Sequence, residues 1–191
     1  MTLHEDALTV LNGLEADPLR QRFLALLDTG PESVLPDAAG PHLTASALIV
    51  DPLRGKVLLC LHKRIGRWLQ MGGHCEPGDP TLAAAALREA REESGIDGLV
   101  ISAEPIGIDV HPVRCRFGPS EHLDVRYAAL APPDAVEVCS PESAALGWFA
   151  PDALPAPLGT ATEPLVAPAL AWATATGTRS SRAPSGRRPP L

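Results

Sequence analysis

Three acidic residues close together in the chain could hold a divalent cation. Glu89, Glu92 and Glu93 are spaced i, i+3 and i+4, so they share one face if the segment is helical. Like charges at this spacing destabilise a helix by about 0.2–0.5 kcal/mol per pair, and Mg²⁺ or Mn²⁺, which prefer oxygen ligands, would offset that repulsion. The alternative is an ordinary solvated face, in which Arg88 and Arg91 compensate the charge.

The residues around these acids predict a loop followed by a helix. Gly72, Gly73 and Pro77-Gly78 predict a loop with positive φ angles that leaves carbonyl groups open to a metal or a phosphate. Asp79-Pro80 is typical of an N-cap and a first helical residue, and Gly95 suits the position just after a helix. The residues expected to pack this helix on a sheet are Ala83, Ala86, Leu87, Ala90 and Ser94.

Gly73, Asp79 and the segment Arg88–Ile96 together resemble the Nudix box. Its pattern is Gly, five residues, Glu, seven residues, and then Arg-Glu-apolar-x-Glu-Glu-x-Gly-apolar. The second half matches at every defined position of the sequence REAREESGI. The first half departs twice, because Asp79 replaces Glu and eight residues separate it from Arg88. The resemblance implies an α/β protein, a Nudix-like α/β/α sandwich around a mixed β-sheet.

The resemblance also implies a reaction and a cofactor. Members of the family typically hydrolyse a phosphoanhydride bond in a nucleoside diphosphate linked to another group, by attack of water with divalent cations bound. We expect Mg²⁺, with Mn²⁺ as the alternative. Glu92 and Glu93 are the expected principal metal ligands, Glu89 is a further ligand or the base, and the Gly72 carbonyl is the expected backbone ligand.

Two further residues complete the predicted catalytic set. Glu142 precedes a Trp-containing strand, where the family often places an additional carboxylate, and it competes with Glu89 as the general base. Glu137 and Glu121 are alternatives for the same place. Arg88 is expected to orient Glu89 or brace the glycine loop rather than touch substrate.

Two other functions stay open. One is a Nudix module that binds a nucleotide with little or no turnover, supported by Asp79 and the extra spacer residue. The other is an isomerase of a prenyl diphosphate, for which the chain offers no second cysteine-bearing motif.

Basic and polar residues on either side of the box predict substrate contacts. Lys63, Arg64 and Arg67 could receive the charge of a diphosphate, or they could form a solvated turn. The alternating residues after the box offer a second set, for which an exposed sheet face is the alternative. That set consists of His122, Asp124 and Arg126, with His111 nearby.

The remaining pattern divides the chain into three parts. Residues 1–40 are predicted to be a helical extension, 41–176 the Nudix domain, and 177–191 a disordered tail with four arginines and no acid. The extension could cover a sheet edge, join a dimer or cap the pocket. The expected strands are His42–Val50, Lys56–His62, Arg67–Met71, Leu99–Ile101, Ile106–Val110, Arg114–Phe117, Glu121–Leu130 and Leu146–Phe149, and the expected last helix is Glu163–Thr176.

Composition limits the partners. The 191 residues are 45% hydrophobic, which suits one domain with a sizeable core. The net charge of −7 argues against stable nucleic-acid binding, and the expected partner is a small nucleotide or related diphosphate. The four cysteines are widely spaced, so we expect reduced thiols. We expect a cytoplasmic protein without a signal peptide or membrane span, and a homodimer is a family-level alternative to a monomer.

Overall fold

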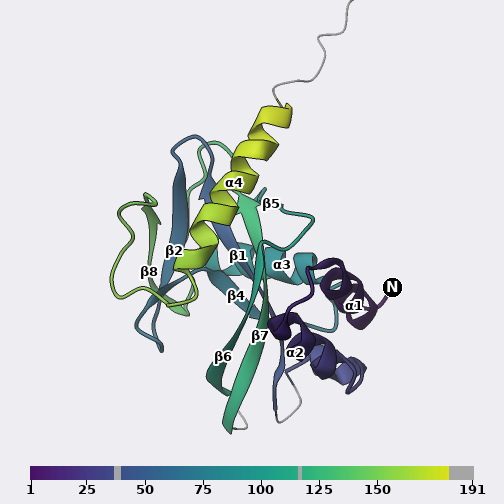
Figure 1. The fold of residues 1–191 in the computed structure, drawn as a ribbon. Helices are drawn as coiled ribbons and strands as arrows, with labels where there is room; N and C mark the ends of the chain where they lie inside the picture. The colour runs from purple at the N-terminus through teal and green to yellow at the C-terminus, as the bar shows by residue number, and fades with distance from the viewer. Residues whose placement is uncertain (37–39, 116–117, 181–191) are drawn as a thin grey trace, which may run out of the picture.

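The computed structural model describes residues 1–36, 40–115 and 118–180 of the chain. Its elements follow the predicted order, with helices at both ends of the chain and a sheet between them (Figure 1). The elements are α1 (Leu3–Gly13), α2 (Pro18–Leu27), a 3-10 turn (Pro31–Val34), β1 (His42–Asp51), β2 (Lys56–His62), β3 (Trp68–Leu69), β4 (Met71–His74), α3 (Leu82–Ser94), β5 (Val100–Ile101), β6 (Gly107–Cys115), β7 (Gly118–Leu130), β8 (Ser143–Phe149) and α4 (Glu163–Ser180).

The sheet is mixed, as predicted. Its central path is β3-β2-β1-β7-β5, while β4 pairs with β1, β6 with β7 and β8 with β2. The long pair β1 and β7 is parallel and all the other pairings are antiparallel. The expected hairpin of β1 and β2 is present, with Asp51 paired to Lys56.

Alternate residues of β1 face two different cores. Ala45 and Ile49 belong to the core under α1, α2 and α3, whereas Leu48 and Val50 pack with residues of α4. This alternation follows from the two-residue period of a strand. Figure 1 shows α4 crossing one side of the strands, with α3 behind them. The predicted α/β/α sandwich is therefore confirmed.

The N-terminal helices are built into the first core. Ala7, Leu11 and Phe23 are fully buried there. The Asp6 carboxylate accepts a hydrogen bond of 2.7 Å from the Leu82 backbone amide, so α1 satisfies one of the free amides at the start of α3. The helix start at Asp17-Pro18 is confirmed. Of the three alternatives for the extension, this packing against the sheet and α3 supports the first, a covering role.

The glycine segment and the start of the box helix differ from the prediction. Gly72 and Gly73 lie in β4, paired with β1, rather than in a loop, and neither has a positive φ angle. Thr81, not Asp79, is the N-cap of α3, because its hydroxyl accepts from the Ala84 amide at 3.0 Å. The predicted end is confirmed, since Gly95 is left-handed with φ of 66°.

Two other boundaries also moved. The predicted strand Ile106–Val110 continues through His111 and Pro112 to Cys115 in β6, so it includes part of the separately predicted strand Arg114–Phe117. Pro112 is tolerated there because β6 pairs only with β7 in the described part of the sheet, so one edge needs no donor. Helix α4 continues to Ser180, past the expected start of a tail at residue 177, and residues 181–191 lie outside the described residues. Within the described residues, no helix is long and apolar enough to span a membrane.

Candidate active site

Helix α3 presents the three glutamates at different depths. Glu93 is buried and 7% exposed, and its carboxylate accepts a hydrogen bond of 3.1 Å from the Gly72 backbone amide. The side chain of Glu89 is 15% exposed and that of Glu92 is 59% exposed. The exposed fraction therefore increases from Glu93 through Glu89 to Glu92. The Gly72 amide fixes Glu93, and the Gly72 carbonyl as a metal ligand stays a prediction.

The three glutamates line a pocket together with the segment before β8. Its other lining residues are Ser140, Pro141 and Glu142. Lys63 holds this segment in place, because its backbone amide donates to the Glu142 carbonyl at 3.1 Å and its Nζ donates to the Pro141 carbonyl at 2.6 Å. The structure thus brings Glu142 to the box acids. The two alternatives to Glu142 have other partners. Glu137 accepts a hydrogen bond from the Trp148 indole, and Glu121 forms an ion pair with Arg22.

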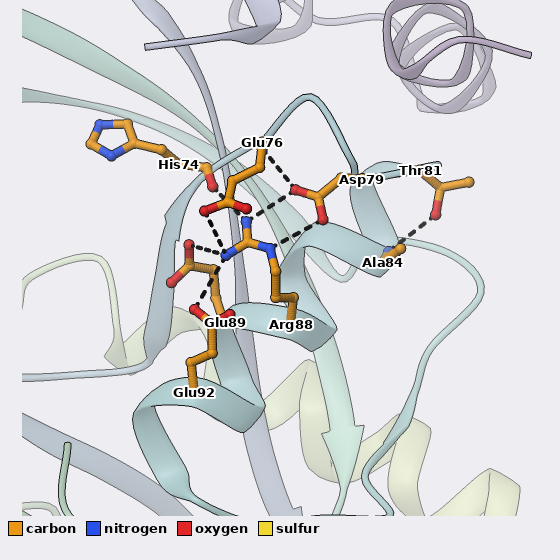
Figure 2. Close-up of polar contacts among 8 residues, drawn as sticks. All are labelled: His74, Glu76, Asp79, Thr81, Ala84, Arg88, Glu89 and Glu92. Atoms are coloured by element: carbon orange, nitrogen blue, oxygen red, sulfur yellow. Dashed lines mark hydrogen bonds and ion pairs between the residues drawn. The ribbon is translucent and has the colours of Figure 1, made fainter.

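Arg88 is the centre of the polar contacts at the start of the box (Figure 2). Its guanidinium donates to Asp79 through Nε at 3.1 Å and through a terminal nitrogen at 3.0 Å. It also donates to Glu89 at 2.9 Å, to the His74 carbonyl at 2.8 Å and to Glu92 at 3.3 Å. Arg88 therefore links β4 to α3 and contacts Glu89, which is compatible with the role expected for it.

The two glycines of β4 lie where neighbouring atoms leave little room for a side chain. A Cβ atom on Gly72 would lie 2.3 Å from the Cβ of Ser46, and one on Gly73 would lie 2.7 Å from the Glu89 carboxyl carbon. Gly72 must lack a side chain because the atoms it would meet belong to β1 at or next to its backbone, whereas a side chain on Gly73 would push the Glu89 carboxylate out of its position. Glycine here allows β4 to approach β1 on one side and the Glu89 carboxylate on the other.

Burial and mutual repulsion act on the carboxyl groups of the pocket. Burial raises the pKa of Glu93 to about 8, the Gly72 amide opposes this, and Glu89, Glu142 and Glu92 add to it by repulsion. Burial also raises the pKa of Glu89, against the lowering effect of Arg88. An all-oxygen donor set whose charges repel one another fits a hard divalent cation such as Mg²⁺ or Mn²⁺, which stabilises the ionised forms.

Asp124 lies in a buried network rather than an open pocket. It accepts from the hydroxyls of Thr44 at 3.2 Å and Ser46 at 2.7 Å, and from Arg126 at 2.9 Å. Arg126 also pairs with Asp109 at 2.8 Å. Asp124 is 3% exposed, so this geometry supports a structural role and lends no support to a substrate contact. Sequence reasoning missed Thr44 and Ser46, although their alternation in β1 placed them on one face.

The two predicted histidines lie side by side on neighbouring strands. His111 of β6 pairs in register with His122 of β7, and the ring centroids are 5.6 Å apart. His111 Nδ1 lies 2.9 Å from Asp109. Burial, together with repulsion from His42, His74 and other cationic neighbours, lowers the pKa of His122 to about 3.

The predicted basic residues occupy the turn between β2 and β3. Arg64 and Arg67 are exposed there, and Arg67 donates to the Leu158 carbonyl at 3.1 Å. Their neighbour Lys63 reaches Pro141 of the pocket wall. The turn thus lies beside the acidic pocket, which is compatible with the predicted contact to a diphosphate.

Comparison with known proteins agrees with this geometry. A model of the NUDIX domain matches residues 40–170, while a search of curated proteins found no match. A NUDIX-family hydrolase from Clostridium perfringens superposes with a TM-score of 0.55 at 24% identity, over 71% of this chain and 97% of that one. A MutT NUDIX hydrolase from Burkholderia pseudomallei gives a TM-score of 0.51 at 28% identity, over 66% and 96%.

A third solved structure shares the fold at lower identity. The dihydroneopterin triphosphate pyrophosphohydrolase of E. coli superposes with a TM-score of 0.55 at 19% identity, covering 65% of this chain and 91% of that one. Since the domain model spans well over half of the chain and coincides with the sheet, the box helix and the acidic pocket, the protein belongs to the Nudix hydrolase family.

Proposed function

We propose that this protein hydrolyses a phosphoanhydride bond in a nucleoside diphosphate linked to another group, with Mg²⁺ or Mn²⁺ bound by the acids of α3. The observation that carries the proposal is the pocket in which Glu89, Glu92 and Glu93 meet Glu142 from a segment far along the chain. Four carboxyl groups around one pocket, on a framework braced by Arg88, suit metal-dependent chemistry on an anionic substrate.

Glu92, Glu93 and Glu89 would hold the cations, with the Gly72 carbonyl as a further ligand. The bound cations would shield the diphosphate charge, orient the attacking water and stabilise the leaving phosphate. Other residues of the chain hold these carboxylates in position. The Gly72 amide holds Glu93 in place, and Arg88 holds Glu89.

Two carboxylates are candidates for the base that takes the proton from water. Glu89 is held by Arg88 and is largely buried, whereas Glu142 is exposed on the opposite wall of the pocket. A base needs to reach the water and to be unprotonated at the working pH. We propose Glu142 as the base and Glu89 as the orienting ligand, and we propose Arg64 and Arg67 as contacts for the diphosphate.

The similar structures bear on the substrate class only. The Burkholderia protein is described as a MutT NUDIX hydrolase and the E. coli protein as a pyrophosphohydrolase of a pterin triphosphate. Both descriptions are compatible with cleavage of a phosphoanhydride. The substrate class proposed for this chain, a small molecule carrying linked phosphates, rests on the acidic pocket and agrees with these descriptions.

The test is release of phosphate and nucleotide from a panel of nucleoside diphosphate derivatives, with Mg²⁺, with Mn²⁺ and with a chelator. We expect metal-dependent release that falls by orders of magnitude in Glu92→Gln and Glu93→Gln. Glu15→Gln, an exposed glutamate in the segment after α1, is the matched control and should keep the wild-type rate. Wild-type rates in both box variants at saturating Mg²⁺ would refute the metal assignment.

The same assay separates hydrolysis from binding alone. If no compound is cleaved but some of them raise the melting temperature, the protein is a nucleotide-binding module. For the base, a loss in Glu142→Gln that increasing the pH does not restore, together with unchanged Mg²⁺ affinity, supports our assignment. An unchanged rate in that variant would return the role to Glu89.

A further inference from the structure

Four potential metal ligands of a different kind meet at one end of the sheet. His42, His74, Cys115 and His122 each offer one ligand atom, and these four atoms all lie within 4.8 Å of one another. Three imidazoles and a thiol form a donor set of nitrogen and sulfur, unlike the oxygen-rich pocket of α3. The nucleotide chemistry proposed above makes no use of this set.

The strand pairing explains why residues so distant in sequence converge. The four residues come from β1, β4, β6 and β7, which are neighbours in the sheet in the order β6-β7-β1-β4. His42 pairs directly with His122, and His74 pairs with Thr44, two residues after His42 on the same face. Ring centroids of His42, His74 and His122 are 4.9–5.1 Å apart.

The orientation of the side chains also suits a common centre. His42 Nδ1 lies 2.9 Å from the Gly40 carbonyl, so it carries the proton, and Nε2 keeps a free lone pair. The Cys115 sulfur is 3.5 Å from His122 Nε2 and 4.0 Å from His42 Nε2. A backbone carbonyl that fixes the tautomer of a histidine in this way is the usual support of a metal-binding imidazole.

An unsatisfied polar atom provides an independent observation. Nε2 of His74 is buried, and among the described residues it has no hydrogen-bond partner. Leaving such an atom unpaired is unfavourable, so native structures rarely do so without a reason. Because this ring lies 5.1 Å from that of His42 and 5.0 Å from that of His122, a ligand among the three rings would satisfy it.

We propose that His42, His74, Cys115 and His122 bind one transition-metal ion, with Zn²⁺ as the best match. Zn²⁺ binds four N and S ligands in a tetrahedron, for which the ligand atoms stand about 3.3–3.7 Å apart. The 3.5 Å between Cys115 and His122 already fits, and the other ligand atoms need to close from within 4.8 Å. Binding releases the Cys115 thiol proton to solvent. His122 is then a metal ligand rather than a substrate contact.

Such an ion would link four strands beside the proposed catalytic pocket. The carbonyl of His74 accepts a hydrogen bond from Arg88, so the cross-linked strand is the one that Arg88 holds against α3. The two sites differ in ligand chemistry, since thiolate and imidazole favour Zn²⁺ whereas carboxylates favour Mg²⁺ or Mn²⁺. One chain can therefore offer separate sites that favour different ions.

The experiment titrates the reduced, metal-free, full-length chain with Co²⁺, which replaces Zn²⁺ and is visible by absorption. We expect one equivalent of Co²⁺ to give tetrahedral visible bands and a thiolate-to-cobalt charge-transfer band. One equivalent of Zn²⁺ should abolish both, and excess Mg²⁺ should not. Cys115→Ser should lose the charge-transfer band and bind Zn²⁺ on the order of 100-fold more weakly.

Controls separate this site from the others. Cys139→Ser removes an exposed thiol outside the cluster, and Glu92→Gln alters the acidic pocket, so both should keep the full spectrum. Thermal unfolding of each metal-free variant checks that it folds, and His122→Asn, which should weaken binding but keep a charge-transfer band, is the second variant. Absence of the band in the wild type, its persistence in Cys115→Ser, or its loss in Cys139→Ser would overturn the proposal.

Discussion

Replacement of Asp79 by alanine tests whether the altered first half of the box is structurally sound. Asp79 accepts two hydrogen bonds from Arg88 and one of 2.8 Å from the Glu76 backbone amide. The Asp79 side chain is 7% exposed and that of Arg88 is 21% exposed. Because the pair is mostly shielded from water, its loss removes more free energy than the loss of a surface ion pair.

The magnitude follows from these contacts. Each hydrogen bond to a charged group contributes about 1.5–3 kcal/mol, and breaking a buried pair costs about 3–5 kcal/mol. Arg88 keeps its bonds to Glu89 and to the His74 carbonyl, so the loss should be smaller than the full value. We therefore expect Asp79→Ala to lower the free energy of unfolding by about 2–4 kcal/mol.

The matched control is Glu76→Ala. Glu76 approaches the same guanidinium at 3.8 Å, but its side chain is 63% exposed. Exposed pairs contribute about 0–1 kcal/mol, so this variant should stay close to the wild type. Urea unfolding in the presence of a chelator measures both variants without a contribution from bound metal. Equal stability of the two variants would refute the view that Asp79 anchors Arg88.

Two further predictions concern a glycine and a thiol. Gly73→Ala should lower turnover by more than tenfold because its Cβ would meet the Glu89 carboxyl at 2.7 Å, whereas Gly78→Ala, with no atom within 4 Å, should leave the steady-state rate unchanged. Burial raises the pKa of Cys60 from 9.0 to about 12, so above pH 9 the unfolded thiol loses its proton while the folded one keeps it. Stability should therefore fall by about 1.4 kcal/mol per pH unit between pH 9 and 12 from this group. The buried Cys75 thiol, whose pKa burial also raises to about 12, adds a similar slope of its own. Unfolding free energies across that range should therefore fall less steeply in Cys60→Val, by the contribution of one thiol, and with the wild-type slope in Cys139→Ser.

Local signals predicted the helices well. The start of α2 at Asp17-Pro18 and the end of α3 at Gly95 were both predicted, because a cap depends on a few neighbouring residues. Asp79 and Thr81 were both possible N-caps of α3. Thr81 is the N-cap in the structure, because the Asp79 carboxylate is bound by Arg88. The choice between them depends on the tertiary structure, so the sequence alone could not settle it.

The role of the glycines depended on a distant strand. Glycine is compatible both with positive φ and with close packing, and only the pairing of Gly72 with Ser46 of β1 shows that packing is the reason. The residues of the acidic pocket, too, could be predicted only in part. The acids of α3 were predictable from their helical spacing, whereas the position of Glu142 depends on the contacts of Lys63. The proximity of His42 to His122 could not be predicted either, because it depends on the pairing of two strands far apart in the sequence.

The extra residue in the box can be placed in the structure. Between Asp79 and Arg88, Pro80 and Thr81 precede the helix and Leu82–Leu87 lie within it. One residue added inside a helix turns every later side chain by about 100°, which would move Arg88 away from Asp79. The observed bidentate contact shows that no such rotation separates them. Since Pro80 and Thr81 lie before the helix, the turn that they form can take up an extra residue without rotating the acids of α3.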